Sequence, residues 1–318
     1  MEAEHEKLSA TLDDNIESIL RSVGNSADVL VRKLTLGETE VKATIIYIDG
    51  IVDTEKIEEQ IIKPLTSFRT EVKEEKVMQV LMNHVITSIG AEEGKDVQTL
   101  VEDLIQGKTI LLVDKLKTGL LLNTAKWPER SAPEPKAQRT PRGPDIGFNE
   151  SITFNTALIR KYIKDSDLRI ESNLNSNINT SFSLVYHEKS VDKEILQNLK
   201  KKLKEMNIPT ALEVGYIEEF ITNETNSMFP LTALTDRPDV VCAEVLEGKI
   251  AIVLDGTPFV LLLPNVFIQL FQSPDDYYTL DRTIQTRRIA RLFFLFLIYS
   301  SSSTIYILYY LPAWANTY

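Results

Sequence analysis

The sequence predicts a mixed α/β protein with two similar lobes, followed by one transmembrane helix. Three features predict this architecture. Apolar β-branched runs alternate with helical patterns, the whole pattern occurs twice at an offset of about 140 residues, and a long apolar segment lies near the C-terminus. At 318 residues and 43% hydrophobic content, the chain can bury more than one core, so two domains are expected.

The two halves of the chain align in two blocks. Residues 44–58 align with 183–197, and residues 104–114 align with 245–255. The offset drifts by only about two residues between the blocks, which indicates one duplicated unit. The identical matches are Asp28 with Asp167, Tyr47 with Tyr186, Val52 with Val191, Asp53 with Asp192, Glu55 with Glu194, Gly107-Lys108 with Gly248-Lys249, and Asp114 with Asp255.

Each copy of the unit is expected to hold a strand, two helices and a closing hairpin. The strand is an apolar β-branched run, and the aspartate after it caps the first helix. A glycine ends the second helix. The hairpin strands are continuous apolar runs, which indicates that both of their faces are covered. For the first and second copy respectively, the expected elements are strands 43–48 and 182–186, helices starting at Asp53 and Asp192, helices 96–106 and 239–247, and hairpins 109–123 and 250–263.

Shifts in composition give the expected domain boundaries. A proline-rich stretch cannot join a helix body or a sheet interior, because proline fixes φ and lacks an N–H donor. One alternative stays open: residues 222–239 are also linker-like, so the segment 240–285 could cross back and complete the first subdomain. The expected parts are an α/β subdomain at 1–130, a proline-rich linker at 131–150, a second α/β subdomain at 151–285, and a transmembrane segment with a short tail at 286–318.

A transmembrane helix is predicted over residues 289–311. About 23 residues suffice to cross a hydrocarbon core of roughly 30 Å. Arg287, Arg288 and Arg291 flank its N-terminal side, so the positive-inside rule places the large N-terminal part in the cytoplasm. A buried C-terminal helix is disfavoured, because the segment has almost no polar face. With a single span, the expected role is anchoring rather than lining an ion path.

The composition argues against several classes of function. The net charge of −11 and the pI of about 5.0 argue against nucleic-acid binding, since no basic stripe with interleaved aromatics reverses that balance. The single cysteine, Cys242, excludes an intramolecular disulfide framework and fits a reducing compartment. Residues 1–20 contain no apolar core segment, so no secretory signal is predicted.

No enzymatic centre, metal site or cofactor is predicted. The Gly-Lys-Thr at 107–109 precedes a strand, whereas a phosphate-binding loop requires a helix N-terminus. The three histidines, His5, His84 and His187, have no second ligand at metal-binding spacing. Cys242 aligns with an apolar residue on an inward helix face of the first copy, which indicates a small core residue rather than a nucleophile.

The most specific motif follows the prolines, over residues 142–160. It begins with Arg-Gly-Pro, continues with Gly-Phe and ends in Leu-Ile-Arg. Its candidate binding residues are Arg142, Gly143, Phe148 and Arg160. Structurally, Arg142 can donate to backbone carbonyls and fix the linker exit, and Arg160 can pair with an acid on its own lobe. Functionally, both can lie at an inter-lobe or inter-subunit contact, which suits a planar guanidinium. The structural interpretation is favoured, and Phe148 is expected to plug the core rather than stack on a ligand.

This block resembles the signature of the A subunits of bacterial spore germinant receptors, the GerA family. Similarity covers most of residues 26–291, including Thr-Asp-Arg-Pro-Asp at 235–239, Leu-Asp-Gly-Thr-Pro-Phe at 254–259 and Ser-Pro-Asp-Asp-Tyr-Tyr at 273–278. The resemblance implies two α/β lobes similar to bacterial substrate-binding proteins. It also implies an integral protein of the spore inner membrane, with its N-terminal domain on the cytoplasmic, spore-core side.

The resemblance further implies a function and partners. Such a subunit is non-enzymatic and acts with a transporter-like B subunit and a lipoprotein C subunit to sense nutrient germinants. It is implied to form homo-oligomers and to take part in the signal transduction and ion release that start germination. The runner-up hypothesis is a small-molecule binding module in which the cleft between the soluble lobes takes a germinant directly.

The end of the chain differs from that family pattern. Family members continue through several membrane helices, whereas this chain stops at Tyr318, and its sequence after about Leu297 departs from the family. The expectation is a truncated or frameshifted product that keeps the sensor-like domain and lacks the pore.

Overall fold

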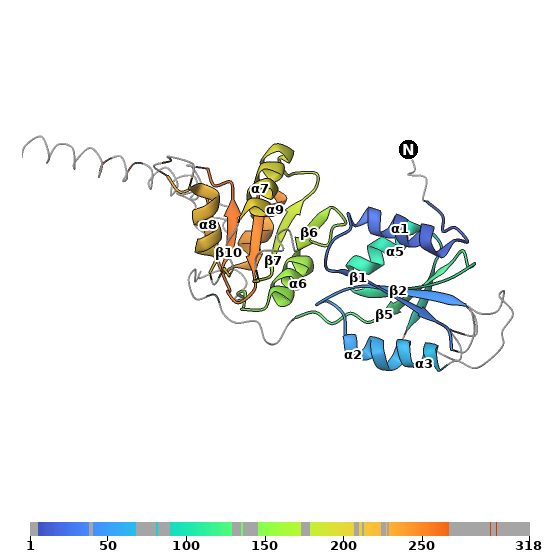
Figure 1. Cartoon of the computed structure of the whole chain (residues 1–318). Coiled ribbons are helices and arrows are strands. Elements are labelled where there is room, and N and C mark those ends of the chain that lie inside the picture. Colours follow the sequence, from blue (N-terminus) through green and yellow to red (C-terminus); the bar gives the residue numbers. More distant parts are fainter. Residues whose placement is uncertain are drawn as a thin grey trace, which may run out of the picture.

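The computed structural model describes residues 6–37, 41–67, 81, 90–128, 135, 146–172, 179–206, 210–211, 213–223, 227, 229–266, 293 and 297. These residues form two lobes that lie side by side, each built around one five-stranded sheet (Figure 1). Every strand pair in these ranges is antiparallel. The predicted mixed α/β class is confirmed for the two lobes.

The first lobe places its sheet between two layers of helices. The strand order is β1-β2-β4-β5-β3. Helices α1 and α5 cover one face, and the consecutive segments α2, η1 and α3 cover the other (Figure 1). The bounds are α1 Leu12–Ser22, β1 Val29–Thr35, β2 Lys42–Ile48, α2 Thr54–Ile57, η1 Glu58–Ile62, α3 Lys63–Thr66, β3 Ala91–Gly94, α5 Val97–Ile105, β4 Lys108–Val113 and β5 Gly119–Asn123.

The second lobe repeats this arrangement. Its strand order is β6-β7-β9-β10-β8. Helices α6 and α9 pack on one face of the sheet, and α7 and α8 pack on the other. The bounds are α6 Ile152–Tyr162, β6 Leu168–Ser172, β7 Phe182–His187, α7 Lys193–Glu205, α8 Val214–Thr222, β8 Ala233–Thr235, α9 Pro238–Leu246, β9 Ile250–Leu254 and β10 Val260–Leu263.

The predicted duplication is present in strand order and in register. Val29 lies opposite Ile48 in the first sheet, and Leu168 lies opposite His187 in the second, as the sequence alignment requires. The prediction of equivalent elements is therefore confirmed. The matched residues occupy the same places: Tyr47 and Tyr186 in β2 and β7, Asp53 and Asp192 as helix N-caps, and Asp114 and Asp255 directly after β4 and β9.

Helices on both faces explain why the hairpin strands are continuous apolar runs. In β9, Ile252 packs in the cluster with α7 and α8, whereas Val253 packs in the cluster with α6 and α9. Successive side chains of a strand point to opposite faces, so both neighbours must be apolar. Complete burial of such a side chain contributes about 1.5–3 kcal/mol relative to exposure. The prediction that these strands are covered on both faces is confirmed.

The hairpin of β9 and β10 belongs to the second sheet. β9 pairs with β7, and Val185 lies opposite Ala251. The alternative in which the segment 240–285 crosses back to complete the first lobe is wrong for these strands. The first lobe has its own hairpin, β4 and β5, in the place beside β2, and β9 and β10 take the equivalent place beside β7 in the second sheet.

Glycines end the second helix of each unit, as predicted. Gly107 has a φ of 90° and Gly248 a φ of 101°, in the left-handed region that glycine adopts without strain. A Cβ at Gly248 would also lie 2.5 Å from the carbonyl oxygen of Ser190. Glycine therefore permits both the turn and its close packing.

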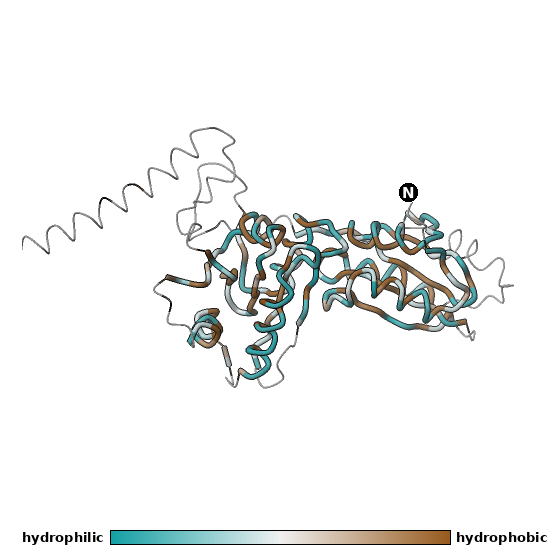
Figure 2. The backbone as a smooth tube through the Cα atoms, turned by 90° about the horizontal axis from the view of Figure 1, so that it is seen from above, coloured by the Kyte–Doolittle hydropathy of each residue, from teal (hydrophilic) through white to brown (hydrophobic). Residues whose placement is uncertain are grey.

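The predicted membrane span over residues 289–311 lies outside the described residues, except for Phe293 and Leu297. Within the described ranges, no helix combines the length and the apolarity that a membrane crossing requires. Along the helices of the two lobes, hydrophobic and hydrophilic residues alternate (Figure 2), as expected where one face of each helix lies on a sheet. The span stays a prediction.

Two asparagines hold the turns before α1 and α6 in the same way. Asn155 is fully buried, accepts from the N–H of Asn149 at 2.9 Å and donates to its carbonyl at 2.6 Å. Asn15 makes the same two bonds with Ser9, at 2.8 and 2.9 Å. Asn155→Ala leaves those backbone groups without partners, so the free energy of unfolding should fall by about 1–3 kcal/mol in urea titrations.

The matched variant Asn15→Ala should lose a similar amount, because the first lobe repeats the same contacts. A loss below about 0.5 kcal/mol in both variants, the usual size for surface substitutions, would contradict a stabilising role for these asparagines.

Candidate functional site

The junction between the lobes joins the outer edge of β6 to a loop of the first lobe. The loop is residues 24–28, between α1 and β1. Ala27 donates its N–H to the carbonyl of Ile170 at 2.8 Å, and Ile170 donates its N–H to Ser26 Oγ at 3.1 Å. An edge strand exposes unpaired backbone groups, and here the first lobe satisfies them. The second sheet is therefore completed by a segment of the other lobe.

A buried ion pair lies beside this backbone contact. Helix α6 carries Arg160, whose Nε and Nη2 donate to the two carboxylate oxygens of Asp28 at 2.7 and 3.0 Å. The side chains are only 1% and 8% exposed. Two parallel bonds fix the direction as well as the distance between the partners. Because Asp28 precedes β1 and Arg160 lies on α6, the pair sets the orientation of one lobe on the other.

The turn after β2 also packs against α6. Gly50 has a φ of 81°. A Cβ at this position would lie 2.9 Å from the Cβ of Ala157 and 3.0 Å from the carbonyl oxygen of Thr153. Any other residue would be strained by its backbone and would push the helix away. Glycine therefore permits the close approach that brings Arg160 within reach of Asp28.

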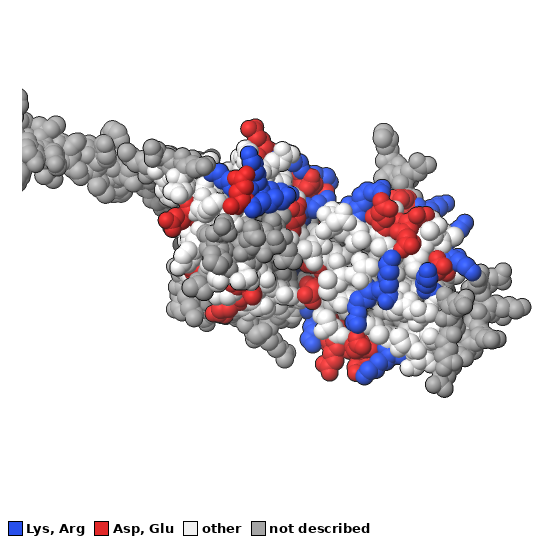
Figure 3. Space-filling model, in the orientation of Figure 1, with Lys and Arg blue, Asp and Glu red and all other residues white. Residues whose placement is uncertain are grey.

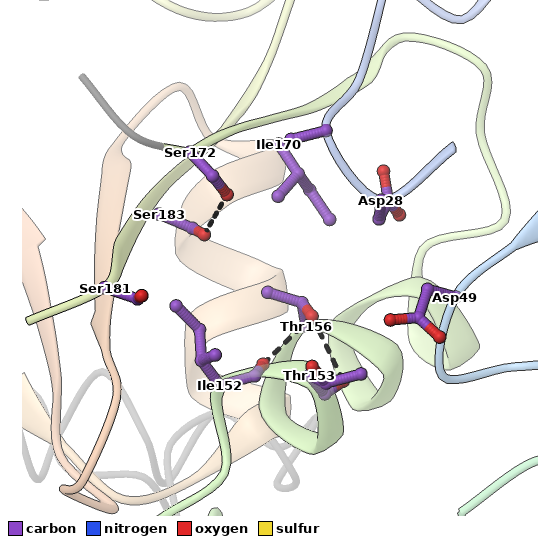
Figure 4. A pocket seen from close by; sticks show the side chains of 10 residues that line it. Asp28, Asp49, Ile152, Thr153, Thr156, Ile170, Ser172, Ser181 and Ser183 are labelled. Atoms are coloured by element: carbon purple, nitrogen blue, oxygen red, sulfur yellow. Dashed lines mark hydrogen bonds between the residues drawn. The ribbon is translucent and has the colours of Figure 1, made fainter. Parts of the chain in front are cut away.

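A cavity of about 210 Å³ lies between the lobes at this junction (Figure 4). Its lining is polar: Figure 4 places the carboxylates of Asp28 and Asp49 on one side and the hydroxyls of Ser172 and Ser183 on another. The lining residues are Ala27, Asp28, Asp49, Ile152, Thr153, Thr156, Ile170, Ser172, Ser181 and Ser183.

The chemistry of the cavity suits a small polar molecule. Asp28 is committed to Arg160, whereas the Oδ1 of Asp49 accepts only from the N–H of Gly50, at 3.0 Å, among the bonds of the described residues. Carboxylates accept from amines and hydroxyls, and serine and threonine hydroxyls both donate and accept. The volume lies below the usual range of about 300–1,000 Å³ for ligand pockets, so only a compact molecule fits.

The sequence-based candidates fall in different environments. Arg142 and Gly143 lie outside the described residues. Phe148 is buried in the core of the second lobe and donates its N–H to the carbonyl of Asp236 at 2.9 Å, so it is packed as a core residue. Arg160 lies at the lobe junction and bonds an acid of the other lobe, not one of its own.

Sequence reasoning missed most of the cavity. Asp28 was visible as a repeat match, but nothing in the sequence indicated that it faces the second lobe. The serines and threonines gave no signal, because isolated hydroxyl residues are common in turns and strand ends. The hydroxyls all belong to the second lobe, and only the packing of the lobes places them opposite Asp28 and Asp49 of the first.

His187 is not isolated, which corrects the sequence prediction. Ligand atoms of Asp165, Asp167 and His187 all lie within 4.8 Å of one another, because the end of β7 lies beside the loop before β6. Lys189 pairs with Asp167, however, and Arg169 lies 3.9 Å from it. The N–H of Asp167 and then His187 lower the pKa of Asp165. Protein cations already balance these carboxylates, so the group is accounted for as an ion-pair cluster.

Cys242 behaves as the sequence predicted. It is buried on α9 in the core of the second lobe, and burial raises the pKa of its thiol. A thiol rather than a thiolate at neutral pH is a poor nucleophile. Its counterpart in the first copy, Val101, is also buried.

The fold and the junction define a class of protein: a domain of two tandem α/β lobes, built from one repeated unit, with a small polar cavity between them. The family comparison agrees with this description. The family model of the Bacillus/Clostridium GerA spore germination protein matches residues 17–312. The chain belongs to the GerA family. The match continues past Leu297, where the sequence was expected to depart from the family.

Relatives and a solved structure give the same result. The chain is 36% identical over 292 residues to spore germination protein KA of Bacillus subtilis (strain 168), covering 91% of this chain and 54% of the relative. It is 30% identical to spore germination protein GerLA of Bacillus cereus, covering 86% of this chain and 55% of that protein. The chain thus spans about half the length of these relatives.

The crystal structure of the N-terminal domain of the A subunit of the Bacillus megaterium spore germinant receptor GerK3 is similar to this fold. The TM-score is 0.66 at 29% sequence identity, and the match covers 84% of this chain and 100% of that chain. The two-lobed arrangement is therefore shared with a domain of a germinant receptor.

Replacing Arg160 tests how much the junction depends on the ion pair. Arg160→Met leaves the Asp28 carboxylate buried without a partner, so the free energy of unfolding should fall by about 3–5 kcal/mol. The double variant Arg160→Met with Asp28→Leu should recover most of this loss, because no uncompensated charge remains. Urea denaturation measures both.

Arg21→Met is the matched control. Arg21 pairs with Glu17 at the surface, where the two side chains are 72% and 73% exposed. Such a pair contributes about 0–1 kcal/mol. Equal losses for Arg160→Met and Arg21→Met would show that the buried pair does not hold the lobes.

Proposed function

We propose that this chain is a non-enzymatic A-type subunit of a nutrient germinant receptor. In this role it takes part in the signal transduction and ion release that start spore germination. The observation that carries the proposal is the family match over residues 17–312, joined to a fold that covers the whole N-terminal domain of the GerK3 A subunit.

The proposal includes a place and partners. The receptor lies in the spore inner membrane, with the two-lobed domain on the cytoplasmic, spore-core side. The flanking Arg287, Arg288 and Arg291 support this orientation. The partners are a transporter-like B subunit, a lipoprotein C subunit and further copies of the A subunit. Arg142 and Gly143, next to the linker exit, belong to a contact between lobes or subunits.

The junction suggests how the domain serves a receptor. The ten residues that line the cavity include no histidine, cysteine, lysine or arginine. The Asp28–Arg160 pair, the Ala27–Ile170 contact and the Gly50 approach instead join the lobes into one stiff body. A stiff body transmits a displacement at one end to the other, whereas loosely tethered lobes would absorb it.

Germination of spores tests the proposal. In a spore former from which paralogous receptors have been removed, deletion of the gene, or of its full-length parent, should slow germination triggered by nutrients. Vegetative growth should be unchanged, because the receptor acts only in the spore. The fall in optical density after addition of single amino acids or sugars measures the response.

Complementation sharpens this experiment. Arg21→Met should restore the response and Arg160→Met should restore it less, at equal protein amounts in the spore membrane. Normal responses to every nutrient in the deleted strain would rule out the receptor role.

The second candidate is direct binding of a germinant between the lobes. It is favoured by the polar cavity of about 210 Å³, where Asp49 and several hydroxyls face one space. A compact amine or polyol matches these groups. In this case the domain itself senses the nutrient, and the ligand stabilises the closed junction.

Thermal shift of the full chain against amino acids, sugars and nucleosides tests this binding. A ligand at about 100 times its Kd should stabilise the fold by about 2.7 kcal/mol. Ser181→Leu narrows the cavity from an exposed position and should abolish the shift. Lys201→Ala, at a separate surface hollow between α7 and α8, should leave it unchanged. No saturable shift with any germinant that triggers the spores would exclude direct binding here.

A further inference from the structure

The outer edge of β6 in the second sheet bonds to another lobe, whereas within the described ranges the equivalent outer edge of β1 in the first sheet does not. In the second sheet, the N–H and carbonyl of Ile170 in β6 point away from β7 and bond to the first lobe. Val31 of β1 is the equivalent residue, because it lies opposite Ile46 as Ile170 lies opposite Val185. The backbone groups of Val31 therefore point outward from the first sheet. Among the described residues, no hydrogen bond reaches them from outside the sheet.

The element that covers this edge in the second lobe also has an equivalent. The covering loop is 24–28, between α1 and β1, and its counterpart between α6 and β6 is the loop 163–167. Ser166 takes the place of Ala27, and Asp165 takes the place of Ser26. The carboxylate of Asp165 is 45% exposed. Its Oδ1 already accepts from the N–H of Asp167 and its Oδ2 lies 3.4 Å from His187, but a carboxylate has about four acceptor sites, so it can accept a further backbone N–H as the Ser26 hydroxyl does.

The helix beside the free edge carries a matching charge. Asn15 and Asn155 make identical contacts, which fixes the correspondence of α1 with α6 and places Glu17 where Ala157 lies. In the second lobe, Lys189 is the equivalent of Gly50, the residue of the first lobe that packs against Ala157. Glu17 and Lys189 are 73% and 76% exposed and opposite in charge. Each now pairs within its own lobe, Glu17 with Arg21 and Lys189 with Asp167, in exposed pairs that contribute only about 0–1 kcal/mol and so can be exchanged. Figure 3 shows acidic and basic side chains close together on the surface of the first lobe.

From this repeated geometry we propose a docking surface for a second copy of the chain. The outer edge of β1, with Glu17 of α1, receives the loop 163–167 and Lys189 of the neighbouring copy. Each chain thus offers one edge without an outside hydrogen bond among the described residues and one loop equivalent to the covering loop, so the contact is heterologous and joins copies head to tail. The inference rests on the proposed function, to which it adds the surface by which A subunits meet.

The contact between copies is weaker than the one within the chain. Leu20 stands where Arg160 would be, so no buried ion pair forms. Glu17 and Lys189 are also longer than Ala157 and Gly50, so the surfaces meet through an exposed ion pair instead of close backbone packing. Exposed pairs contribute about 0–1 kcal/mol. The association is therefore reversible, and it is sensitive to salt.

A charge exchange between copies tests the surface. The full chain in a mild detergent is followed by sedimentation velocity over a concentration series. Wild type should associate, and Glu17→Lys or Lys189→Glu should each raise the apparent dissociation constant about tenfold, since a repulsion replaces an attraction. Mixing the two variants should restore association, because the lysine introduced in one copy then meets the glutamate introduced in the other. Lys201→Glu, on α7, is the control and should change nothing.

Proline substitutions test the strand edge separately. Val31→Pro removes the outward N–H without removing a bond to β2, and edge strands tolerate proline at such positions. Association should weaken as for the charge variants. Lys33→Pro, two residues along the same edge and beyond the docking loop, should associate as wild type. Thermal unfolding confirms that each variant is folded.

Three outcomes would overturn the inference: a monomeric wild type at every soluble concentration, association that ignores both charge variants, or no recovery on mixing. An apparent dissociation constant that is the same for wild type and for both charge variants would leave the receptor role intact and show that the copies meet at another surface. Loss of the germination response in the deletion strain is judged independently, so the two proposals can fail separately.

Discussion

The arrangement of the two lobes depends on the buried pair of Asp28 and Arg160. Both charges are removed from water, which is unfavourable unless geometry and hydrogen bonds compensate. The bidentate contact, with bonds of 2.7 and 3.0 Å, supplies that compensation only in one relative orientation. The backbone bond of Ala27 to β6 and the close approach of Gly50 to α6 then follow from the same orientation. The cavity between the lobes is a product of this fixed geometry.

The duplicated unit shows how one fold takes two roles. Both copies share strand order, register and helix caps, so they were built on the same local rules. They differ at the few residues that meet another lobe. Arg160 and Ala157 in the second copy stand where the first has Leu20 and Glu17. Such differences at the surface decide which edge is covered within the chain and which is left open, while the cores remain equivalent.

Local patterns were enough for one strand, two helices and a hairpin in each lobe, but they did not predict α1, β1, β3, α6, β6, α8 and β8, and they failed where residues distant in sequence meet. The capping aspartates, the glycine stops and the apolar hairpin strands were predicted because each acts within a few residues of itself. The partner of Arg160 was not predicted, since an acid on its own lobe satisfied the same chemistry. The prediction that His187 is isolated failed for a similar reason: its neighbours Asp165 and Asp167 lie on an adjacent strand connection, 22 residues away in the case of Asp165.

The sequence by itself determined that this protein has two α/β units of one pattern, and its motif after the prolines indicated the GerA family. These properties depend on periodicity and on short motifs, which a linear chain displays directly. Only the tertiary structure decided that β9 and β10 complete the second sheet, that Asp28 faces Arg160, and that carboxylates of the first lobe and hydroxyls of the second line one cavity. Those features depend on how the lobes pack. Packing selects one partner among several that are chemically equivalent, and no local pattern records that selection.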